Sequence, residues 1–465
     1  MKRISHKLVQ SWASWGTRFL PFADAASPEL PLSRLLRLSL FQVSVGMALV
    51  LLVGTLNRVM IVELKVPAAL VSSMVALPLL FAPLRALIGF RSDNHRSELG
   101  WRRVPYLWMG SLMQFGGFSI MPFALLVLAG AGQANEAPAW VGHMGAAVAF
   151  LLVGAGVHTT QTVGLALATD LAPQEDQPKV VGLMYVMLLV GMIFSAFLFG
   201  HLLSEYSPGR LVQVIQGAAL TTLILNVVAM WKQEPRSRQR KPGTPVEGSF
   251  SQAWQSFSQG GHALRRLWVV ALGTMAFTME DVLLEPYGGE ILSLSVATTT
   301  MLTATLSAGS LIGFCWASYV LGRGADPFRM ANQGLMVGIP AFMAVILAAP
   351  MGSTLVFASG TFLIGLGAGL FSHGTLTATM NQAPKEQTGL ALGAWGAVQA
   401  TAAGGAMALG GVMRDLLAQN LGALSGYNGV YLLEIVLLVA AWVAMIPLFN
   451  RRQITPEIDA TSNRR

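Results

Sequence analysis

Long runs of apolar residues alternate with short polar blocks along the whole chain. Each run is close to the roughly 20 residues that a helix needs to cross the hydrocarbon core of a bilayer. The runs are continuous and lack the alternation that is typical of strands in membrane barrels. The pattern therefore predicts an all-α membrane protein with about twelve transmembrane helices. The predicted spans are 36–62, 68–90, 104–130, 140–170, 180–203, 208–231, 267–292, 297–322, 330–349, 353–380, 388–416 and 427–449.

The predicted spans form two groups of six, separated by a polar stretch rich in Pro, Gly, Ser and charged residues, as in a solvated linker. An internal echo indicates duplication, because residues 165–182 align without a gap to residues 376–393. Two six-helix halves joined by a linker are typical of the major facilitator architecture. We expect an amphipathic N-terminal segment at 1–35, halves at 36–231 and 267–449, a linker at 232–266 and a tail at 450–465.

Charge is scarce, at 11% of residues, and strongly asymmetric. An even number of spans places both termini and the linker on one side, and most of the 30 Lys and Arg residues fall there. The positive-inside rule makes that side cytoplasmic. Membrane orientation and attraction to anionic lipid account for the net charge of +8, so we expect no nucleic-acid partner. The first residues show no cleavable signal peptide, and the single cysteine, Cys315, excludes an intramolecular disulfide.

Polar residues at the cytoplasmic ends of the predicted spans indicate a latch between helices. Asp93, Arg102 and Arg103 occupy the loop after the second span, and Asp170 ends the fourth. Arginine and aspartate side chains at helix ends pair with each other and with helix dipoles. We expect a structural latch here, and direct contact with a ligand is the alternative.

An acidic run in the seventh span is a candidate site inside the membrane. Glu280, Asp281 and Glu285 lie in the sequence MEDVLLEPYGGE, in which Pro286 and the following glycines are expected to end or bend the helix. Charged groups are costly in lipid and usually serve a function there. The run is either an ion-pair network that fixes the outward end or a site for a proton or ligand.

Three residues of the first two spans are candidate partners for this acidic run. Asn57 and Arg58 lie near the outer end of span one, and Arg85 lies nearer the cytoplasmic end of span two. We expect the first two to reach across the interface between the halves.

His158 and His373 lie within the fourth and tenth spans, at similar places in the two halves. A neutral imidazole can give one nitrogen to a metal while another group orients its N–H. Each histidine is therefore either a metal ligand or a hydrogen-bonding partner for a neighbouring helix. The 49 glycines and 23 methionines suit close helix packing, with an apolar groove as the alternative.

The N-terminal segment carries an apolar stripe at helical spacing, formed by Leu8, Trp12, Trp15 and Phe19. This spacing predicts an amphipathic helix that lies at the membrane surface. A docking site for a partner protein is the alternative. Motifs of enzymes, such as phosphate-binding loops, dinucleotide fingerprints and HExxH, are absent, so we do not expect catalysis.

Four long segments carry a family resemblance. They begin LLRLSLFQVSVGMALV, ALPLLFAPLRALIGF, HTTQTVGLALATDLAP and MEDVLLEPYGGEILSLS, at residues 35, 76, 158 and 279. These stretches resemble the LhaA/PucC family of photosynthetic bacteria, a branch of the major facilitator superfamily, from about residue 30 to 450. Residues 17–32 look closer to LhaA, which serves the core antenna, than to PucC, which serves the peripheral antenna.

The resemblance implies a light-harvesting assembly factor in the cytoplasmic or intracytoplasmic membrane. Its cargo would be bacteriochlorophyll, with His158 and His373 as candidate magnesium ligands. Its partners would be nascent antenna polypeptides, with the reaction centre–antenna complex and late pigment-biosynthesis enzymes as further partners. The N-terminal stripe would then be a docking site for an antenna polypeptide or a biosynthetic enzyme. Two alternatives stay open. One is a secondary transporter of a small or amphipathic solute, and the other is an assembly scaffold that holds no pigment.

Overall fold

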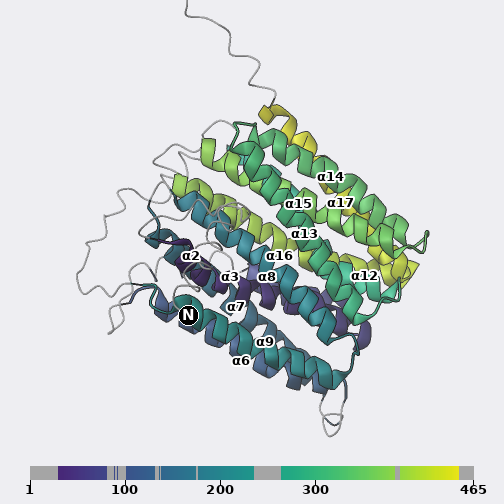
Figure 1. The fold of residues 1–465 in the computed structure, drawn as a ribbon. Coiled ribbons are helices and arrows are strands. Elements are labelled where there is room, and N and C mark those ends of the chain that lie inside the picture. Colours follow the sequence, from purple (N-terminus) through teal and green to yellow (C-terminus); the bar gives the residue numbers. More distant parts are fainter. Residues whose placement is uncertain are drawn as a thin grey trace, which may run out of the picture.

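The computed structural model describes residues 30–80, 88, 92, 101–130, 136, 138–173, 176–234, 263–382 and 388–449. Regular structure within these ranges is helical throughout, and ten of the described helices are long and apolar enough to cross a membrane. Figure 1 shows them as a bundle of long helices that run side by side. The predicted all-α membrane fold is confirmed.

The first half of the bundle precedes the linker. Its elements are α2 (Leu32–Leu38), α3 (Leu40–Leu49), the π-helical segments η2 (Val50–Leu56) and η3 (Val59–Glu63), α4 (Ala68–Leu80), α6 (Val104–Leu128), α7 (Ala139–Leu171), α8 (Gln177–Leu202) and α9 (Pro208–Met230). The elements from α2 to η3 together make the first span. The described part of α4 ends at Leu80, so the predicted end at residue 90 lies beyond it.

The second half follows the linker. Its elements are α11 (Ala263–Thr278), the short 3₁₀ turn η5 (Glu280–Val282), α12 (Leu284–Glu290), α13 (Val296–Leu321), α14 (Pro327–Ala348), α15 (Thr354–Gln382), α16 (Thr388–Leu421) and α17 (Ala423–Phe449). Each predicted span coincides with a helix, but the seventh is broken at η5. We call the end of the bundle at Glu234 and Ala263 the linker end, and the opposite end the far end.

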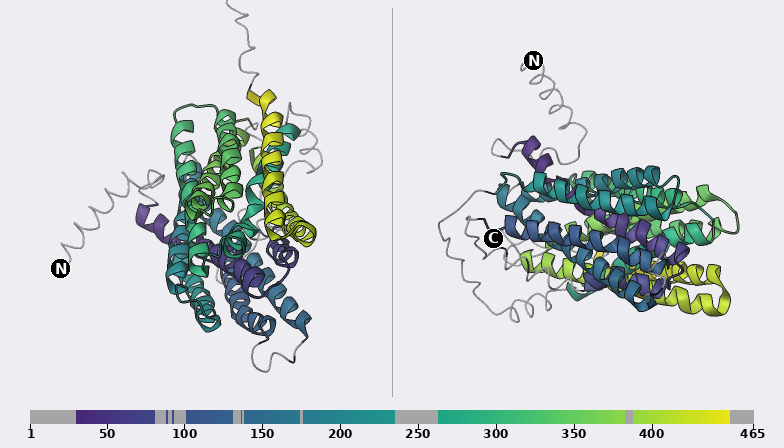
Figure 2. Two further views of the ribbon diagram at one scale, coloured as in Figure 1. Left: turned by 90° about the vertical axis from the view of Figure 1, so that its right-hand side faces the viewer. Right: turned by 90° about the horizontal axis from the view of Figure 1, so that it is seen from below.

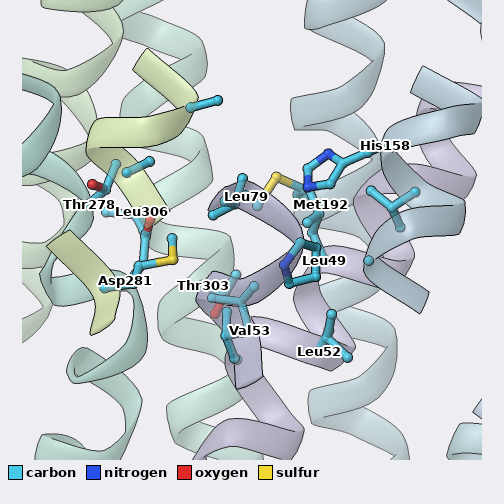
Figure 3. Close-up of a pocket in the computed structure, with 18 of the residues that line it drawn as sticks. Leu49, Leu52, Val53, Leu79, His158, Met192, Thr278, Asp281, Thr303 and Leu306 are labelled. Atoms are coloured by element: carbon cyan, nitrogen blue, oxygen red, sulfur yellow. The ribbon is translucent and has the colours of Figure 1, made fainter. Parts of the chain in front are cut away.

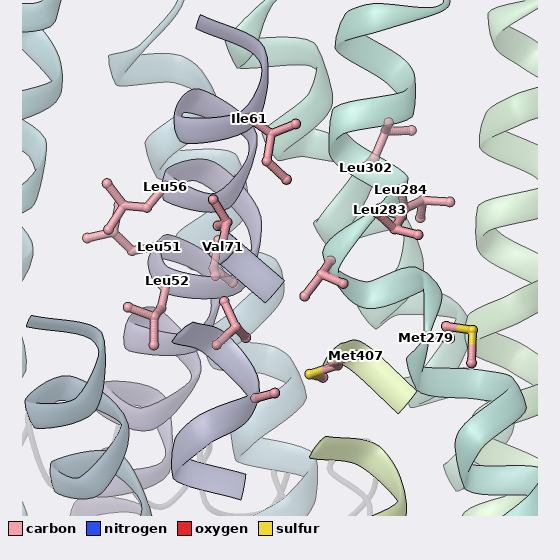
Figure 4. Close-up of a cluster of buried hydrophobic side chains, with 14 of the residues drawn as sticks. Leu51, Leu52, Leu56, Ile61, Val71, Met279, Leu283, Leu284, Leu302 and Met407 are labelled. Carbon is pink, nitrogen blue, oxygen red and sulfur yellow. The ribbon is translucent and has the colours of Figure 1, made fainter. Parts of the chain in front are cut away.

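The two halves meet along two pairs of helices. Helix α4 packs on α16, and α8 packs on α13. Figure 2 shows the purple-to-teal first half beside the green-to-yellow second half. At this boundary an apolar cluster joins the π-helical part of span one to the broken span seven, as Figure 4 shows. Its labelled members are Leu51, Leu52, Leu56, Ile61, Val71, Met279, Leu283, Leu284, Leu302 and Met407.

Small residues and outward-facing apolar side chains suit this bundle to lipid. A Cβ atom on Gly309 of α13 or Gly365 of α15 would collide with the backbone of the partner helix, so glycine lets these helices touch. On the outer surface Phe194, Trp268 and Leu355 are 60%, 65% and 77% exposed. Such side chains are stable outside when hydrocarbon is the solvent. The protein is a multi-pass membrane protein.

Candidate functional site

The broken seventh span organises the centre of the molecule. Helix α11 ends at Thr278, η5 makes one tight turn, and α12 begins at Leu284. Pro286 lies in the first turn of α12, where proline is tolerated, but it has no N–H to donate to the carbonyl of Val282 four residues before it. That carbonyl instead accepts a 2.7 Å hydrogen bond from Asn57 Nδ2 of the first half. The break therefore lies before the proline, and α12 continues through both glycines, contrary to our expectation.

The three predicted acidic residues divide between the central cavity, which two of them line, and the interior of the bundle. Glu280 is buried at 1% exposure, and Asp281 lines the central cavity. Glu285 is also buried and lines the cavity, and one of its oxygens accepts a hydrogen bond from Thr303 Oγ1. A Cβ atom on Gly54 of η2 would collide with the Glu285 carboxyl, so glycine makes room for this acid between the halves.

Glu434 is a third buried acid, beside Glu280 and Glu285, that our sequence analysis missed. It lies on α17 with 0% exposure and interacts electrostatically with Glu280 and Asp281. The sequence does contain a signal that could have identified this residue, because Glu434 is the one charged residue in the predicted span 427–449. Buried charge in a membrane span indicates a functional site by default.

Arg58 and Asn57 reach the second half, as their position near the outer end of span one suggested. Arg58 pairs with Glu63 through a 2.5 Å Nη1–Oε1 contact, and its other Nη donates to the carbonyl of Leu294 at 3.1 Å. Both residues therefore bond to backbone carbonyls in or just after the broken span. Within the described residues neither makes a hydrogen bond to a carboxyl of the acidic run, but the charge of Arg58 acts on Glu285.

A larger polar network lies at the far end. The sequence analysis offered an ion-pair network at this end through the acidic run, but it did not predict the partners of Glu290. Arg414 of α16 pairs with Glu290 of α12 and, at 2.8 Å, with its neighbour Asp415. The Tyr427 hydroxyl donates to Glu290 at 2.8 Å. Asp415 accepts from the backbone N–H of Ala69 at 2.7 Å, which extends the network to α4 of the other half. We call Glu290, Arg414, Asp415 and Tyr427 the far-end network.

The predicted latch lies at the linker end. Asp170 Oδ2 accepts from Arg103 Nε at 3.0 Å and from Arg102 Nη2 at 3.2 Å. Glu234, which was not predicted, accepts from the backbone N–H groups of Arg102, Arg103 and Val104 at 2.7–3.1 Å. A carboxylate at the first N–H groups of a helix stabilises the start of α6. Asp93 and Arg85 lie outside the described residues, as do Leu8, Trp12, Trp15 and Phe19.

A central cavity of about 330 Å³ lies between the two halves. Figure 3 shows Leu49, Leu52, Val53, Leu79 and Met192 on the side of the first half, with Thr278, Asp281, Thr303 and Leu306 across from them. His158 of α7 also lines it, with Gln161 one turn further on. The cavity therefore has a largely apolar wall, an acidic wall and one imidazole.

His373 lies in a separate recess of about 250 Å³ between α8, α13, α15 and α16. Three aromatic residues, Tyr185, Phe314 and Trp395, line this recess with it. The Phe314 and His373 rings are 4.3 Å apart between centroids, and the buried His373 Nδ1 has no hydrogen-bond partner among the described residues. The two candidate histidines thus face different spaces, and Gln399 lines both.

Comparison with known proteins identifies relatives along nearly the whole chain. The family model described as "PUCC protein" matches residues 55–453. Protein PucC of Rhodovulum sulfidophilum is 63% identical over 438 residues, which cover 93% of this chain and 96% of that protein. Protein PucC of Cereibacter sphaeroides is 59% identical, covering 97% and 98%. The bacteriochlorophyll synthase 44.5 kDa chain of Rhodobacter capsulatus is 27% identical, covering 88% and 93%.

Solved transporter structures share the fold. The nucleoside transporter NupG matches with a TM-score of 0.66 at 14% identity, covering 90% of this chain and 100% of that chain. The D-xylose–proton symporter matches with a TM-score of 0.66 at 15% identity, covering 88% and 96%. These likenesses confirm the major facilitator fold. The names of the two more similar sequence relatives favour PucC over the LhaA likeness that residues 17–32 suggested.

Proposed function

The chain belongs to the PucC protein family, and from that premise we propose that it is an assembly factor for the photosynthetic light-harvesting antenna. It binds bacteriochlorophyll and delivers it to nascent antenna polypeptides. The observation that carries this proposal is the near full-length identity of 59–63% to proteins named PucC. A more distant relative is named as a chain of bacteriochlorophyll synthase, which supports a connection with this pigment. The proposal assigns no catalytic step to the chain.

The proposed location is the bacterial cytoplasmic or intracytoplasmic membrane, with both termini in the cytoplasm. The basic residues at the linker end support this orientation under the positive-inside rule. Further proposed partners are the reaction centre–antenna complex and late pigment-biosynthesis enzymes. Because the relatives carry the PucC name, we take the peripheral antenna as the first client to test and the core antenna as the second.

The two cavities offer complementary parts of a pigment site. The recess supplies aromatic surfaces for a flat macrocycle and a histidine whose Nδ1 is unpartnered, as an axial magnesium ligand requires. The central cavity supplies an apolar wall and His158. Pockets for drug-sized ligands measure about 300–1,000 Å³, and a macrocycle with a long hydrocarbon tail is larger than most such ligands. We therefore expect each cavity to hold only part of the pigment, with the rest in lipid.

Purification in mild detergent from a pigment-making host tests the carrier function. We expect the protein, freed of antenna polypeptides, to retain bacteriochlorophyll at a constant molar ratio in its absorption spectrum. We expect His373→Phe to lower that ratio by more than half, because the variant removes the nitrogen that is free to bind magnesium. His158→Phe tests the central cavity in the same way, and the exposed His201→Phe is the matched control.

The outcomes separate the remaining alternatives. A pigment-free preparation that still captures antenna polypeptides supports the scaffold and contradicts the carrier. Equal pigment retention in all three histidine variants contradicts the proposed ligands but leaves carriage intact.

A secondary transporter is the second candidate, because Asp281 and Glu285 line a cavity between two halves of a transporter fold. Uptake of a solute into proteoliposomes that is lost in Asp281→Asn would favour it.

A further inference from the structure

Two buried acids lie next to each other at the break in the seventh span, and no cation among the described residues pairs with them. Glu280 of η5 and Glu434 of α17 are 1% and 0% exposed. The two carboxyls interact with each other, and Glu280 Oε2 and the Glu434 oxygens meet no hydrogen-bond donor from any other described residue. An unpaired buried carboxylate is strongly destabilised in a medium of low polarity, and two neighbouring carboxylates cannot both be ionised there.

Within the described residues, no cation interacts with the pair. The titratable groups that interact with Glu280 and Glu434 are a third acid, Asp281, and the phenol of Tyr431, which in turn interacts with Tyr287 and Tyr427. The π-helical segment η2, which packs on η5, carries no titratable side chain. The charged residues of α16 near this region, Arg414 and Asp415, are bound in the far-end network. Glu285 on α12 faces Thr303 and the cavity. Neutral carboxyls are the stable form in this setting.

The pair is placed so that its charge affects both the cavity and the contact between halves. Asp281, the next residue after Glu280, lines the central cavity and gives a polar route towards it. Val282, the last residue of the same turn, accepts the hydrogen bond from Asn57 of the first half. Ionising the pair requires water to enter beside this turn, and a hydrated turn cannot hold the same packing against η2.

We propose that Glu280 and Glu434 form a proton-binding site that holds the broken seventh span closed against the first half. Proton release accompanies the opening of this contact, and Asp281 connects the pair to the cavity. The ligand of the site is the proton itself. The inference does not depend on pigment binding, so it can fail while the assembly function stands.

Infrared difference spectroscopy of the pigment-free protein in nanodiscs tests the site directly. We expect the carbonyl stretch of protonated carboxyl groups to be present at about pH 7, at which exposed glutamates are ionised. Glu280→Gln and Glu434→Gln should each remove part of this band, whereas Glu205→Gln, which changes an exposed glutamate in the far-end loop, should leave it unchanged. Absence of the band in the wild-type protein, or an equal band in all variants, would overturn the proposal.

Thermal unfolding keeps the proposal testable if a glutamine variant does not fold. A carboxyl that binds its proton in the folded protein and releases it on unfolding stabilises the fold less as the pH rises. We expect the wild-type Tm to fall between about pH 6 and pH 9, and a folded Glu434→Gln protein to show a smaller fall. A wild-type Tm that stays constant or rises over this range contradicts the proposal that Glu280 and Glu434 bind a proton in the folded protein.

Discussion

The linker end and the far end of the bundle both carry arginine–carboxylate pairs, but the polar bonds at the linker end stay within one half and those at the far end also cross between the halves. At the linker end, Asp170 and Glu234 tie together helices of the first half alone. At the far end, Asp415 bonds to the backbone of Ala69, so that α16 of the second half is held to α4 of the first. The bonds of Asn57 and Arg58 to the broken span also cross between halves.

Similar ion pairs and hydrogen bonds therefore have different structural roles at the two ends. Bonds within one half stabilise that half and leave it free to move as a unit, whereas bonds between halves resist their separation. The structure therefore closes the far end with polar bonds, and the linker-end latch can persist while the halves move. Substitutions at the two ends should separate these roles.

The largest effect is expected for Arg414→Met. The substitution leaves Glu290 and Asp415 without their cation in a region where Arg414 is only 12% exposed. Losing one partner of a buried ion pair costs about 3–5 kcal/mol, and partial exposure of the acids places our expectation near the lower value. Reversible unfolding in detergent measures this loss. Arg210→Met, at an exposed far-end arginine, is the control and should change stability little.

The same variant should open the far end. Spin labels on Ser204→Cys and Met351→Cys, placed in far-end segments of opposite halves of a protein that also carries Cys315→Ser, should report a longer distance in Arg414→Met. An unchanged distance would show that the far-end network stabilises the fold without closing it.

A smaller effect of the same kind is expected for Gly411→Ala. The added Cβ would collide with Ser72 Oγ and lie 2.7 Å from the carbonyl oxygen of Ala68, both on α4. Overpacking of this kind costs about 1–3 kcal/mol and pushes the helices apart. Gly405→Ala on the same helix is the matched control, because nothing lies within 4 Å of its added Cβ. If both alanine variants were equally stable, α4 and α16 would not be held as closely as the structure shows.

The smallest effect is expected for Glu234→Ala at the linker end. The substitution removes the acceptor for three backbone N–H groups at the start of α6, and loss of a helix cap costs about 1 kcal/mol. We expect lower stability with no change in the far-end spin-label distance. Glu205→Ala serves as the exposed control. A longer far-end distance in Glu234→Ala would contradict the separation of roles.

Much of the fold could be predicted because lipid imposes a simple rule on the sequence. Each span must be apolar over the width of a bilayer, so the position of every span could be located, including α16 with its many small residues. The latch pair Arg103–Asp170 was also accessible, since both residues lie at helix ends on one side of the membrane. These features depend on local composition and on whether a loop follows an odd-numbered or an even-numbered span, which decides its side of the membrane.

The parts that could not be predicted depend on the rotation and pairing of helices. Spacing alone does not show that Glu434 faces Glu280, or that His158 and His373 open into different spaces. The sequence did not connect Arg414 with Glu290, because Glu290 lies on α12, 124 residues away along the chain. Apolar spans fix their own length and position, but which face meets which neighbour is decided by side-chain packing across the bundle.

The widened turns of the first span have a consequence for insertions and deletions. In η2 and η3 the backbone bonds reach five residues back, as in the 3.0 Å bond from Leu64 N to the Val59 carbonyl, so each turn contains extra residues compared with an α-helix. Removing one residue from 50–56 would permit ordinary α-helical winding there, and because an α-helical turn takes about one residue fewer, Asn57 and Arg58 would still point towards the other half. The same deletion in an ordinary α-helical span would turn every later side chain by about 100° around the helix axis. A single missing codon in the first span should therefore leave the halves coupled, whereas one in α13 should not.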